Sequence, residues 1–516
     1  MQLQLLETSQ STSRQKPGER VILCGAFALF AALLAVLLHK HEMFGDEAQV
    51  WLIARQSHNL FELVAHLRYE GHPALWYLLV AIPAHLSGTF VWLKIFNYVF
   101  ALLFAGMVLT ETRLPVDIRV LSLFSFFVFF EMGVISRSYM LAAVLLLAAT
   151  RCLLREKSRH YLAMVLLALA INTHFFAIPV AAAVFLWLYW LDPDRISASA
   201  LSRLKEGRFW RSVGIMVWAL FFCYLTLRPA ADSFNSDYSI NGLGWFGYLG
   251  VSIGQFWSQF VALVPLLLSE RGRQLLLPAD HVSALAMFLS LTFLVLLVAA
   301  QQTRQTRWFL STGLAFWLLA AVSTVHRPLV HHFNLVFVLI LLALIASGRG
   351  EGNRVWLTSG WSRAVIMTVL WMQFVICLQF SVLQMFNPFT TAELTAKWLV
   401  KSGLTNRPLI VAPDYAASVV LASTGIRSAY FPTCQCEGEF VVYRQGRDAK
   451  RQVTPEEYEA VAAKYGVKPI VATHWQLSEE SMRRMGVRLL YTPAKAFYWP
   501  WEDMWVYGDK GLNPPG

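Results

Sequence analysis

The sequence predicts a polytopic α-helical membrane protein that ends in a small extracytoplasmic α/β domain. Of its 516 residues, 57% are hydrophobic and only 15% are charged, whereas a soluble domain carries about 25% charged residues. Apolar runs of about 20 residues recur through the first three-quarters of the chain, as in multi-pass membrane proteins. From about Pro388 onward the composition becomes mixed, and strand-like segments alternate with helix-like segments.

Basic residues gather in the loops between the apolar runs and thereby orient the chain. Arg14, Lys16 and Arg20 precede the first run, so the positive-inside rule predicts a cytoplasmic segment over 1–20. The runs predict about eleven spans, at 21–39, 91–110, 119–135, 140–154, 161–174, 176–191, 212–227, 282–300, 308–324, 332–347 and 364–386. The transmembrane domain is therefore expected over 21–387, with 388–516 outside a bacterial-type inner or plasma membrane. The net charge of +11 reflects this orientation, and no nucleic-acid partner is expected.

Two further apolar segments do not fit as simple crossings. Residues 73–86 are too short to span a bilayer. Residues 244–268 are long enough, but counting them as a span would place Arg304 and Arg307 outside. We expect both segments to dip into the outer face of the membrane or to lie on it.

The loop after the first span contains two capping-box patterns, in which a polar residue is followed three positions later by Gln or Glu. The patterns start at Asp46 and Asn59. They predict short helices over about 47–57 and 60–68, whose apolar side chains favour a position along the membrane interface. Capping is the simpler explanation of Asp46. However, an acidic pair, a Tyr-Glu pair and a His-Pro turn crowd this one outer loop, which favours a chemical role.

The C-terminal domain alternates between strand and helix patterns. The segments RPLIVAPD, KPIVATHW and VRLLYTP predict strands, and YAASVVLASTG, TPEEYEAVAAKYG and SEESMRRMG predict helices. This alternation is typical of an α/β domain with a largely parallel sheet. The domain contains no nucleotide-binding motif. Cys434 and Cys436 are only two positions apart, a spacing that would strain a disulfide between them.

GDEAQVWLIA (residues 45–54), followed by YEGHPALWYLL (residues 69–79), resembles the first outer loop of the GT-C membrane glycosyltransferases. This superfamily includes the protein O-mannosyltransferases and the aminoarabinose and RgtA/B/C/D-like sugar transferases. Its pattern is an acidic pair after span one, two juxtamembrane helices, and a His-Pro motif that opens an apolar helix. The match covers roughly residues 20–160, and beyond them only the general layout agrees.

The resemblance implies a hexosyl- or pentosyltransferase that moves a sugar from a polyprenyl-phosphate donor to an acceptor hydroxyl on the extracytoplasmic side. The resemblance leaves open whether the acceptor is a glycan, a lipid or a protein. The other expected partner is the membrane lipid around the protein. Asp46 matches the catalytic acidic position, and Glu47 is its neighbour in the pair. A carboxylate can act as general base towards the acceptor hydroxyl, and attack opposite the leaving group would invert the anomeric centre.

The leaving phosphate gains negative charge and needs cations more than it needs an acid. The residues expected at the donor phosphate are Lys94, Arg137, Tyr139 and His174. Those expected to contact substrate are Tyr69, Glu70, His72, His331 and His332. Four of these have simpler explanations. Tyr139 could belong to an interfacial aromatic belt, His174 could be structural, and Tyr69 and Glu70 could finish the second short helix.

No cofactor is expected to be required. Members of the superfamily often carry an Asp five residues after the Arg of the second outer loop, but this chain has Ala142 there. A divalent cation therefore remains an option without a strong signal. The segment HRPLVHH contains His326, His331 and His332, but their spacing fits no familiar helix-borne ligand set. No residue is assigned to a metal.

Two other functions compete with the transferase. A transporter or flippase of lipid-linked sugars would explain a charge such as Lys94 within a span. However, transporters tend to have paired halves, and the sequence has no internal repeat. A scaffold would tolerate loss of the Asp46 and Arg137 charges but would depend on 388–516. A transferase would lose activity with either charge, and loss of 388–516 would alter its choice of acceptor.

Overall fold

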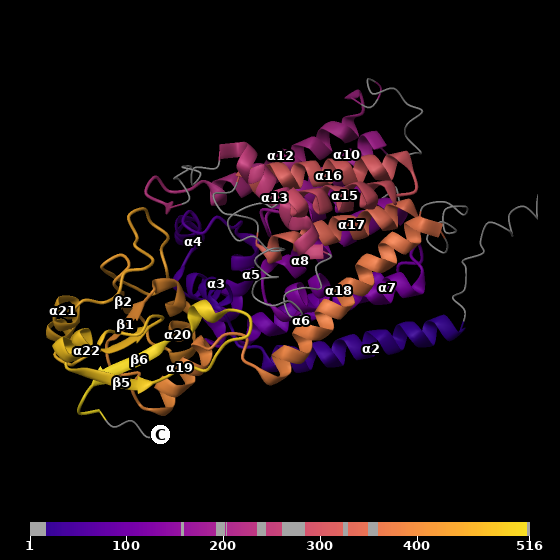
Figure 1. Ribbon diagram of the computed structural model, residues 1–516. Helices are drawn as coiled ribbons and strands as arrows, with labels where there is room; N and C mark the ends of the chain where they lie inside the picture. The colour runs from indigo at the N-terminus through magenta and orange to yellow at the C-terminus, as the bar shows by residue number, and fades with distance from the viewer. Residues whose placement is uncertain are drawn as a thin grey trace, which may run out of the picture.

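The computed structural model describes residues 17–155, 159–191, 202, 204–234, 244–260, 284–323, 329–348 and 360–512 (Figure 1). A bundle of apolar helices occupies the chain up to Phe386, and an α/β part, residues 392–512, lies beside one end of it (Figure 1). Three short helices lie where the two parts meet: α3 (Gly45–Gln56), α4 (Leu60–Leu67) and α5 (Leu75–Leu86).

The bundle consists of long helices with shorter apolar helices between them. Its elements are α2 (Pro17–Lys40), α6 (Val91–Leu109), α7 (Val116–Leu123), the π-helix η2 (Phe126–Val134), α8 (Ser138–Arg155), α9 (His160–Ile171), α10 (Ala177–Leu186), η4 (Trp187–Leu191), α12 (Gly207–Leu227), α13 (Gly244–Phe260), α15 (Ala284–Ala299), α16 (Arg304–Ser323), η7 (Val330–Phe333), α17 (Asn334–Ser347) and α18 (Gly360–Phe386). Among the described helices, α2, α6, α12, α17 together with η7, and α18 are long and apolar enough to cross a membrane.

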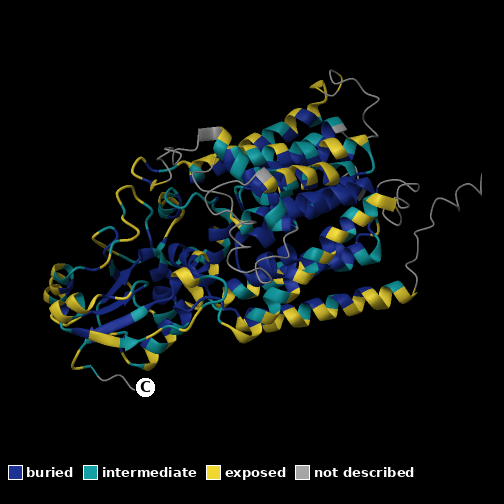
Figure 2. Cartoon of the chain, in the orientation of Figure 1, coloured by how far each residue is buried: buried dark blue, intermediate teal, exposed yellow. Residues whose placement is uncertain are grey.

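Burial separates the inside of the bundle from its outside. Every residue of α17 is buried, whereas α2 turns apolar side chains such as Val21 and Leu29 outward (Figure 2). A water-soluble protein would bury such a stripe of large apolar side chains. The protein is therefore a helical integral membrane protein, whose outer helices face lipid.

The span expected at 119–135 is not one continuous helix. Helix α7 ends at Leu123, and η2 begins at Phe126 after Ser125, whose hydroxyl accepts from the Val128 amide. The hydroxyl also donates to the Ser122 carbonyl oxygen, which fixes the bend between the two segments. π-Helical segments are rare, and those that do occur are often found at functional sites. This one ends three residues before Arg137.

The described part of 244–268 forms helix α13 (Gly244–Phe260), which packs against α15 and α16. Its expected position at the outer face of the membrane stays a prediction. Phe256 and Phe260 are fully buried, and the Phe256 ring lies 5.4 Å from Trp317 and 5.1 Å from Phe333. Residues 261–268 lie outside the described part of the chain. The other segment forms α5, which keeps an exposed apolar face that includes Ile82.

The two loop helices form where expected, but α3 is capped and placed differently. The Asn59 side chain accepts from the Glu62 amide and caps α4. The residue before α3 is Phe44, whose amide donates to the Glu47 carboxylate, so Asp46 is not the cap. Trp51 of α3 is fully buried, because α3 packs between α5 and the α/β part, so this side chain does not face lipid.

The α/β part contains a six-stranded mixed sheet, so the expectation of a largely parallel sheet is wrong. In the order β3-β2-β1-β4-β6-β5, its strands are β1 (Leu409–Ala412), β2 (Ala429–Phe431), β3 (Cys436–Gly438), β4 (Ile470–Thr473), β5 (Val487–Tyr491) and β6 (Trp505–Asp509). The two parallel pairs are β1–β2 and β1–β4, with Ile410 of β1 opposite Tyr430 of β2 and Val471 of β4. The pairs β2–β3, β4–β6 and β5–β6 are antiparallel.

Helices and short turns cover this sheet. They are α19 (Ala392–Lys401), η9 (Asp414–Ala416), α20 (Ala417–Thr424), α21 (Pro455–Tyr465), α22 (Glu479–Met485) and η10 (Pro500–Glu502). Thr454 and Glu457 form a capping box at the start of α21. Cys434 and Cys436 form a disulfide, against the expectation drawn from their spacing.

Candidate active site

A cavity of about 300 Å³ lies between α3, the loop before α5, the start of α8 and the α/β part. Four of the residues predicted from the sequence line it, namely Asp46, Glu70, His72 and Arg137. They come from two outer loops that are far apart in the sequence. The cavity therefore brings the acidic pair loop, the His-Pro motif and the Arg of the next loop to one place.

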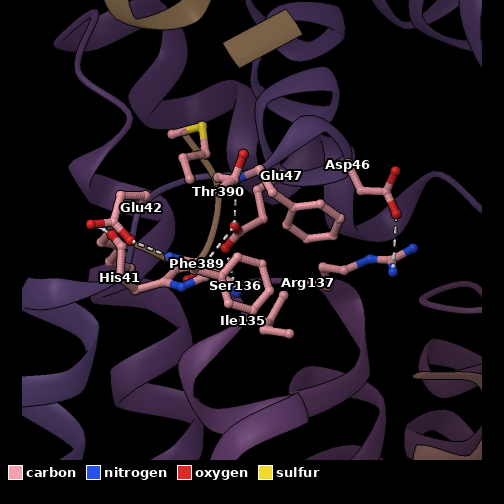
Figure 3. A network of polar contacts seen from close by, with 12 residues as sticks. His41, Glu42, Asp46, Glu47, Ile135, Ser136, Arg137, Phe389 and Thr390 are labelled. Carbon is pink, nitrogen blue, oxygen red and sulfur yellow. Dashed lines mark hydrogen bonds and ion pairs between the residues drawn. The ribbon is translucent and has the colours of Figure 1, made fainter. Parts of the chain in front are cut away.

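Asp46 and Arg137 face each other across the cavity (Figure 3). Asp46 Oδ2 lies 3.1 Å from Arg137 Nη1, and the Asp46 side chain is 48% exposed while that of Arg137 is 10% exposed. Burial opposes the charge on Arg137, but the Asp46 carboxylate together with Tyr139, Glu131 and Tyr77 outweighs burial and raises the pKa of the guanidinium. Arg137 Nη1 makes no hydrogen bond within the described part of the chain, so it can still donate to a bound anion.

Glu47 lies outside this cavity and connects its two sides (Figure 3). One carboxylate oxygen accepts from the Ser136 amide at 2.6 Å, and the other contacts His41 Nε2 at 2.9 Å and the Phe44 amide at 3.2 Å. Burial opposes its ionisation, but His41 and the two amides outweigh burial and lower the pKa of Glu47. Glu47 therefore ties the start of α3 to the residue before Arg137.

Glu70 and His72 have pKa values displaced in opposite directions. Glu70 Oε1 accepts from Gln49 Nε2 at 2.8 Å, while burial and the nearby Asp46 carboxylate raise the pKa of Glu70 to about 8. His72 Nδ1 lies 3.1 Å from the Glu70 carbonyl oxygen. That oxygen only accepts, so Nδ1 carries the proton. Burial and Arg137 lower the pKa of His72 to about 4, so at neutral pH its Nε2 is a hydrogen-bond acceptor.

A cluster of aromatic and imidazole rings lies next to Arg137. The Tyr139 ring centroid is 4.0 Å from that of His174 and 6.0 Å from that of His331, and the Arg137 guanidinium carbon lies 5.3 Å from the Tyr139 ring. His72 also contacts this cluster, 5.8 Å from His174. Tyr139 Oη and His174 Nε2 are buried without a hydrogen-bond partner in the described chain. Two buried polar atoms without partners beside a guanidinium have the chemistry to hold an anion.

Three predicted residues make other contacts. Lys94 Nζ donates to the His41 carbonyl oxygen at 2.6 Å and does not line the cavity. Tyr69 Oη donates to Asp232 Oδ1 at 2.8 Å, on the rim formed with the α/β part. The His332 ring packs edge-to-face against that of His331, with their centroids 4.5 Å apart, and His332 Nδ1 accepts from the Leu329 amide.

The α/β part supplies one wall of the cavity, which sequence reasoning missed. Tyr443 and Arg447 line the cavity, and Arg447 pairs with both oxygens of Asp414. Gln49 of α3 binds this wall through the amide and carbonyl of Val441, at 3.2 and 2.7 Å. No local motif marks this wall, because Gln49 and Val441, which join it to α3, lie 392 positions apart in the sequence.

No group of three His, Cys, Asp or Glu side chains within the described residues is arranged to hold a metal ion. Ala142, where members of the superfamily often carry Asp, is fully buried in α8. His326 lies outside the described part of the chain. The chemistry that this arrangement does offer is a half-exposed carboxylate opposite a cation, with neutral hydrogen-bonding groups around both.

No family model and no curated protein matches this chain. Its structure is similar to the crystal structure of ArnT from Cupriavidus metallidurans bound to undecaprenyl phosphate, with a TM-score of 0.50 and 12% sequence identity. The chain has the fold of ArnT. The match covers 97% of this chain and 99% of ArnT, so it includes the α/β part as well as the loop motifs. The resemblance predicted from the sequence is therefore confirmed for the fold.

The raised pKa of Glu70 has a consequence for stability. Its pKa is about 8 in the folded protein against an ordinary 4.5, so the folded state holds a proton that the unfolded state releases. The contribution of Glu70 to the free energy of unfolding is complete below about pH 4.5. It is lost as the pH rises towards about 8. We expect the thermal unfolding temperature to fall over this range, and Glu70→Gln to make the fall shallower. The exposed Glu459→Gln is the control, and an unchanged slope in Glu70→Gln would contradict the assignment.

Proposed function

We propose that this protein is an integral-membrane glycosyltransferase that moves a sugar from a polyprenyl-phosphate donor to an acceptor hydroxyl on the extracytoplasmic side. The observation that carries the proposal is the half-exposed Asp46 carboxylate opposite the buried Arg137 guanidinium in one cavity. ArnT, which shares the fold, was crystallised with undecaprenyl phosphate, and this supports a polyprenyl phosphate as the carrier.

Asp46 acts as the general base in this proposal. The acceptor oxygen attacks the anomeric carbon while Asp46 takes its proton, and the bond from that carbon to the phosphate oxygen breaks. The phosphodiester leaves as a phosphate monoester with one more negative charge, and the sugar is inverted. Arg137 pairs with Asp46, so a bound phosphate that takes over Arg137 frees the carboxylate for the hydroxyl.

The residues around Arg137 form the donor phosphate site. Arg137 contributes charge and two-pronged hydrogen bonding, and Tyr139 Oη and His174 Nε2 are the buried polar atoms that still lack partners in the described chain. Lys94 is not included, because its ammonium contacts the His41 carbonyl oxygen. We also propose that no divalent cation is required, since Arg137 itself supplies a positive charge at the phosphate.

The sugar would occupy the rest of the cavity. Glu70, with its pKa near 8, is largely protonated at neutral pH and can donate to a sugar hydroxyl, whereas His72 Nε2 can accept from one. Trp76 and Tyr443 line the same space and offer ring faces to the pyranose or furanose. These contacts fix orientation without adding a second ionised carboxylate next to Asp46.

The test supplies a panel of labelled polyprenyl-phosphate sugars to the purified protein in nanodiscs, with a membrane extract as acceptor. A nanodisc has no enclosed compartment, so release of free polyprenyl phosphate reports chemistry and not transport. We expect release from at least one donor, and equal release in EDTA. If no donor is cleaved while liposomes containing the protein move lipid-linked sugar across the bilayer, the protein is a transporter. If neither release nor transport occurs, the result favours the third function, a scaffold.

A further inference from the structure

Three successive backbone amides at the start of α3 each donate to a buried glutamate. The Met43 amide donates to Glu393 at 2.8 Å, the Phe44 amide to Glu47 at 3.2 Å, and the Gly45 amide to Glu502 at 2.7 Å. An α-helix leaves the amides of its first turn without partners in its own backbone. Here one partner comes from α3 itself, and two come from the α/β part.

Glu393 and Glu502 reach this turn from far along the chain. They lie 350 and 457 positions after the residues whose amides they accept. Glu393 belongs to α19 and Glu502 to η10, and their carboxylates meet α3 beside Asp46. The α/β part therefore completes the backbone turn that carries the proposed general base.

The contact between Glu502 and Gly45 is close and held from both sides. The second Glu502 oxygen accepts from Thr390 Oγ1 at 2.9 Å, and Glu502 is only 2% exposed. A Cβ atom on Gly45 would lie 2.7 Å from Glu502 Oε1 and 3.3 Å from the Tyr415 carbonyl oxygen. A glycine is thus needed for the carboxylate to approach the helix backbone this closely.

We propose that Glu502 is a positioning residue for catalysis, which fixes the first turn of α3 and thereby aims Asp46 at the reacting centre. The inference rests on the proposed function and deepens it. Glu47 ties the same turn to Ser136, next to Arg137, so Glu502 holds the carboxylate side of the pair while Glu47 aligns the guanidinium side. The α/β part is then a component of the catalytic machinery, as well as a wall of the cavity.

The central comparison is between Glu502→Ala and Glu502→Gln. Alanine leaves the Gly45 amide without an acceptor, and a misplacement of about 1 Å at a catalytic group can cost about 100-fold. We expect Glu502→Ala to lower kcat about 10- to 100-fold with the donor KM unchanged. Glutamine keeps an oxygen for the Gly45 amide and an NH2 group for Thr390, so it should restore most of kcat. Glu459→Ala, an exposed site on α21, is the control for expression and assay.

The outcomes separate positioning from a purely structural contact. A merely structural Glu502 would lower the unfolding temperature while kcat of the folded fraction stayed at the wild-type value, and this result would overturn the proposal. A Glu502→Gln variant as impaired as Glu502→Ala would overturn it too, because the proposed role needs an acceptor and not a charge.

A second variant approaches the same contact from the other side. Gly45→Ala inserts the Cβ that meets Glu502, so we expect a similar loss in kcat. In the double variant Gly45→Ala, Glu502→Ala the contact is already broken and the space is vacated, so the two losses should not multiply. Multiplicative losses would show that the two residues act independently, which contradicts the proposal.

Hydrogen exchange keeps this inference separate from the proposed function. We expect the amides of residues 43–46 to exchange at least about tenfold faster in Glu502→Ala than in the wild type or Glu502→Gln. If this change occurs but no donor is cleaved by the wild type, the turn is held as inferred and the transferase proposal fails. If the wild type transfers sugar and Glu502→Ala alters neither exchange nor kcat, the positioning proposal fails alone.

Discussion

Asp46→Asn is expected to lower kcat by about 10³-fold, within the range of about 10²–10⁴ that a positioned general base contributes. Asparagine has the same shape and keeps an oxygen that can accept from Arg137, but it cannot take the acceptor proton. Donor binding should therefore be retained. The measurement is kcat and donor KM in nanodiscs, together with the affinity for polyprenyl phosphate.

Asp448→Asn is the matched control, because Asp448 is an exposed aspartate in the α/β part near the cavity wall. Its kcat should equal that of the wild type. An Asp46→Asn enzyme with wild-type kcat would exclude Asp46 as the base. A loss confined to KM would instead make Asp46 a binding residue.

Arg137→Ala is expected to reduce kcat/KM by about 10²–10³-fold, comparable to the loss of one preorganised charge-stabilising group in other enzymes. Arg137 is the cation paired with Asp46 in the cavity, and both the bound donor and the departing phosphate monoester would lose its charge. Arg137→Lys keeps the charge but not the two-pronged geometry, so it should recover only part of the loss.

The readout for Arg137 is kcat/KM together with the affinity for free polyprenyl phosphate, which should fall in the same order, wild type, lysine, alanine. Arg484→Ala provides the control, because Arg484 of α22 forms an exposed ion pair with Glu456 of α21 and does not line the cavity. If Arg137→Ala bound polyprenyl phosphate as tightly as the wild type, the phosphate would lie elsewhere in the protein.

Four residues that line the cavity could be predicted from the sequence, because they lie in short motifs. Asp46, Glu70 and His72 fall in one outer loop, and Arg137 falls in the next. Loops on one side of a membrane can meet at the ends of their helices, so their order and side were enough to expect them together. The cavity contains all four.

The roles of the residues around them depended on contacts that no local pattern records. Lys94 could be placed at a helix end from the sequence, but its partner, the His41 carbonyl oxygen, could not. The burial of α3 likewise arises from the α/β part. An amphipathic helix next to a membrane is expected at the interface, until a second surface is known to cover it.

The sheet shows a related limit. Strands β1, β4 and β5 were recognised as apolar or alternating runs, whereas β2 and β3 have only three residues each and therefore no readable period. Strand β6 was also missed. It lies between β4 and β5 and pairs antiparallel with each of them. Missing strands thus changed the predicted topology more than any wrong assignment did.

The contacts of Glu393 and Glu502 also change one expectation about deletion. If the α/β part only selected the acceptor, its removal would alter specificity and leave donor cleavage intact. Because it completes the turn that carries Asp46, its removal should abolish cleavage. A deletion therefore no longer separates a scaffold from a transferase, and point variants must do so.

The most direct test counts both products in one reaction. With the donor identified, wild type and Asp46→Asn in nanodiscs are incubated with labelled donor and membrane extract, and free polyprenyl phosphate and acceptor-bound sugar are quantified from the same sample. The account predicts equal amounts of the two products from the wild type, and almost none of either from the variant. Acceptor labelling without polyprenyl phosphate release, or equal yields from both proteins, would contradict it.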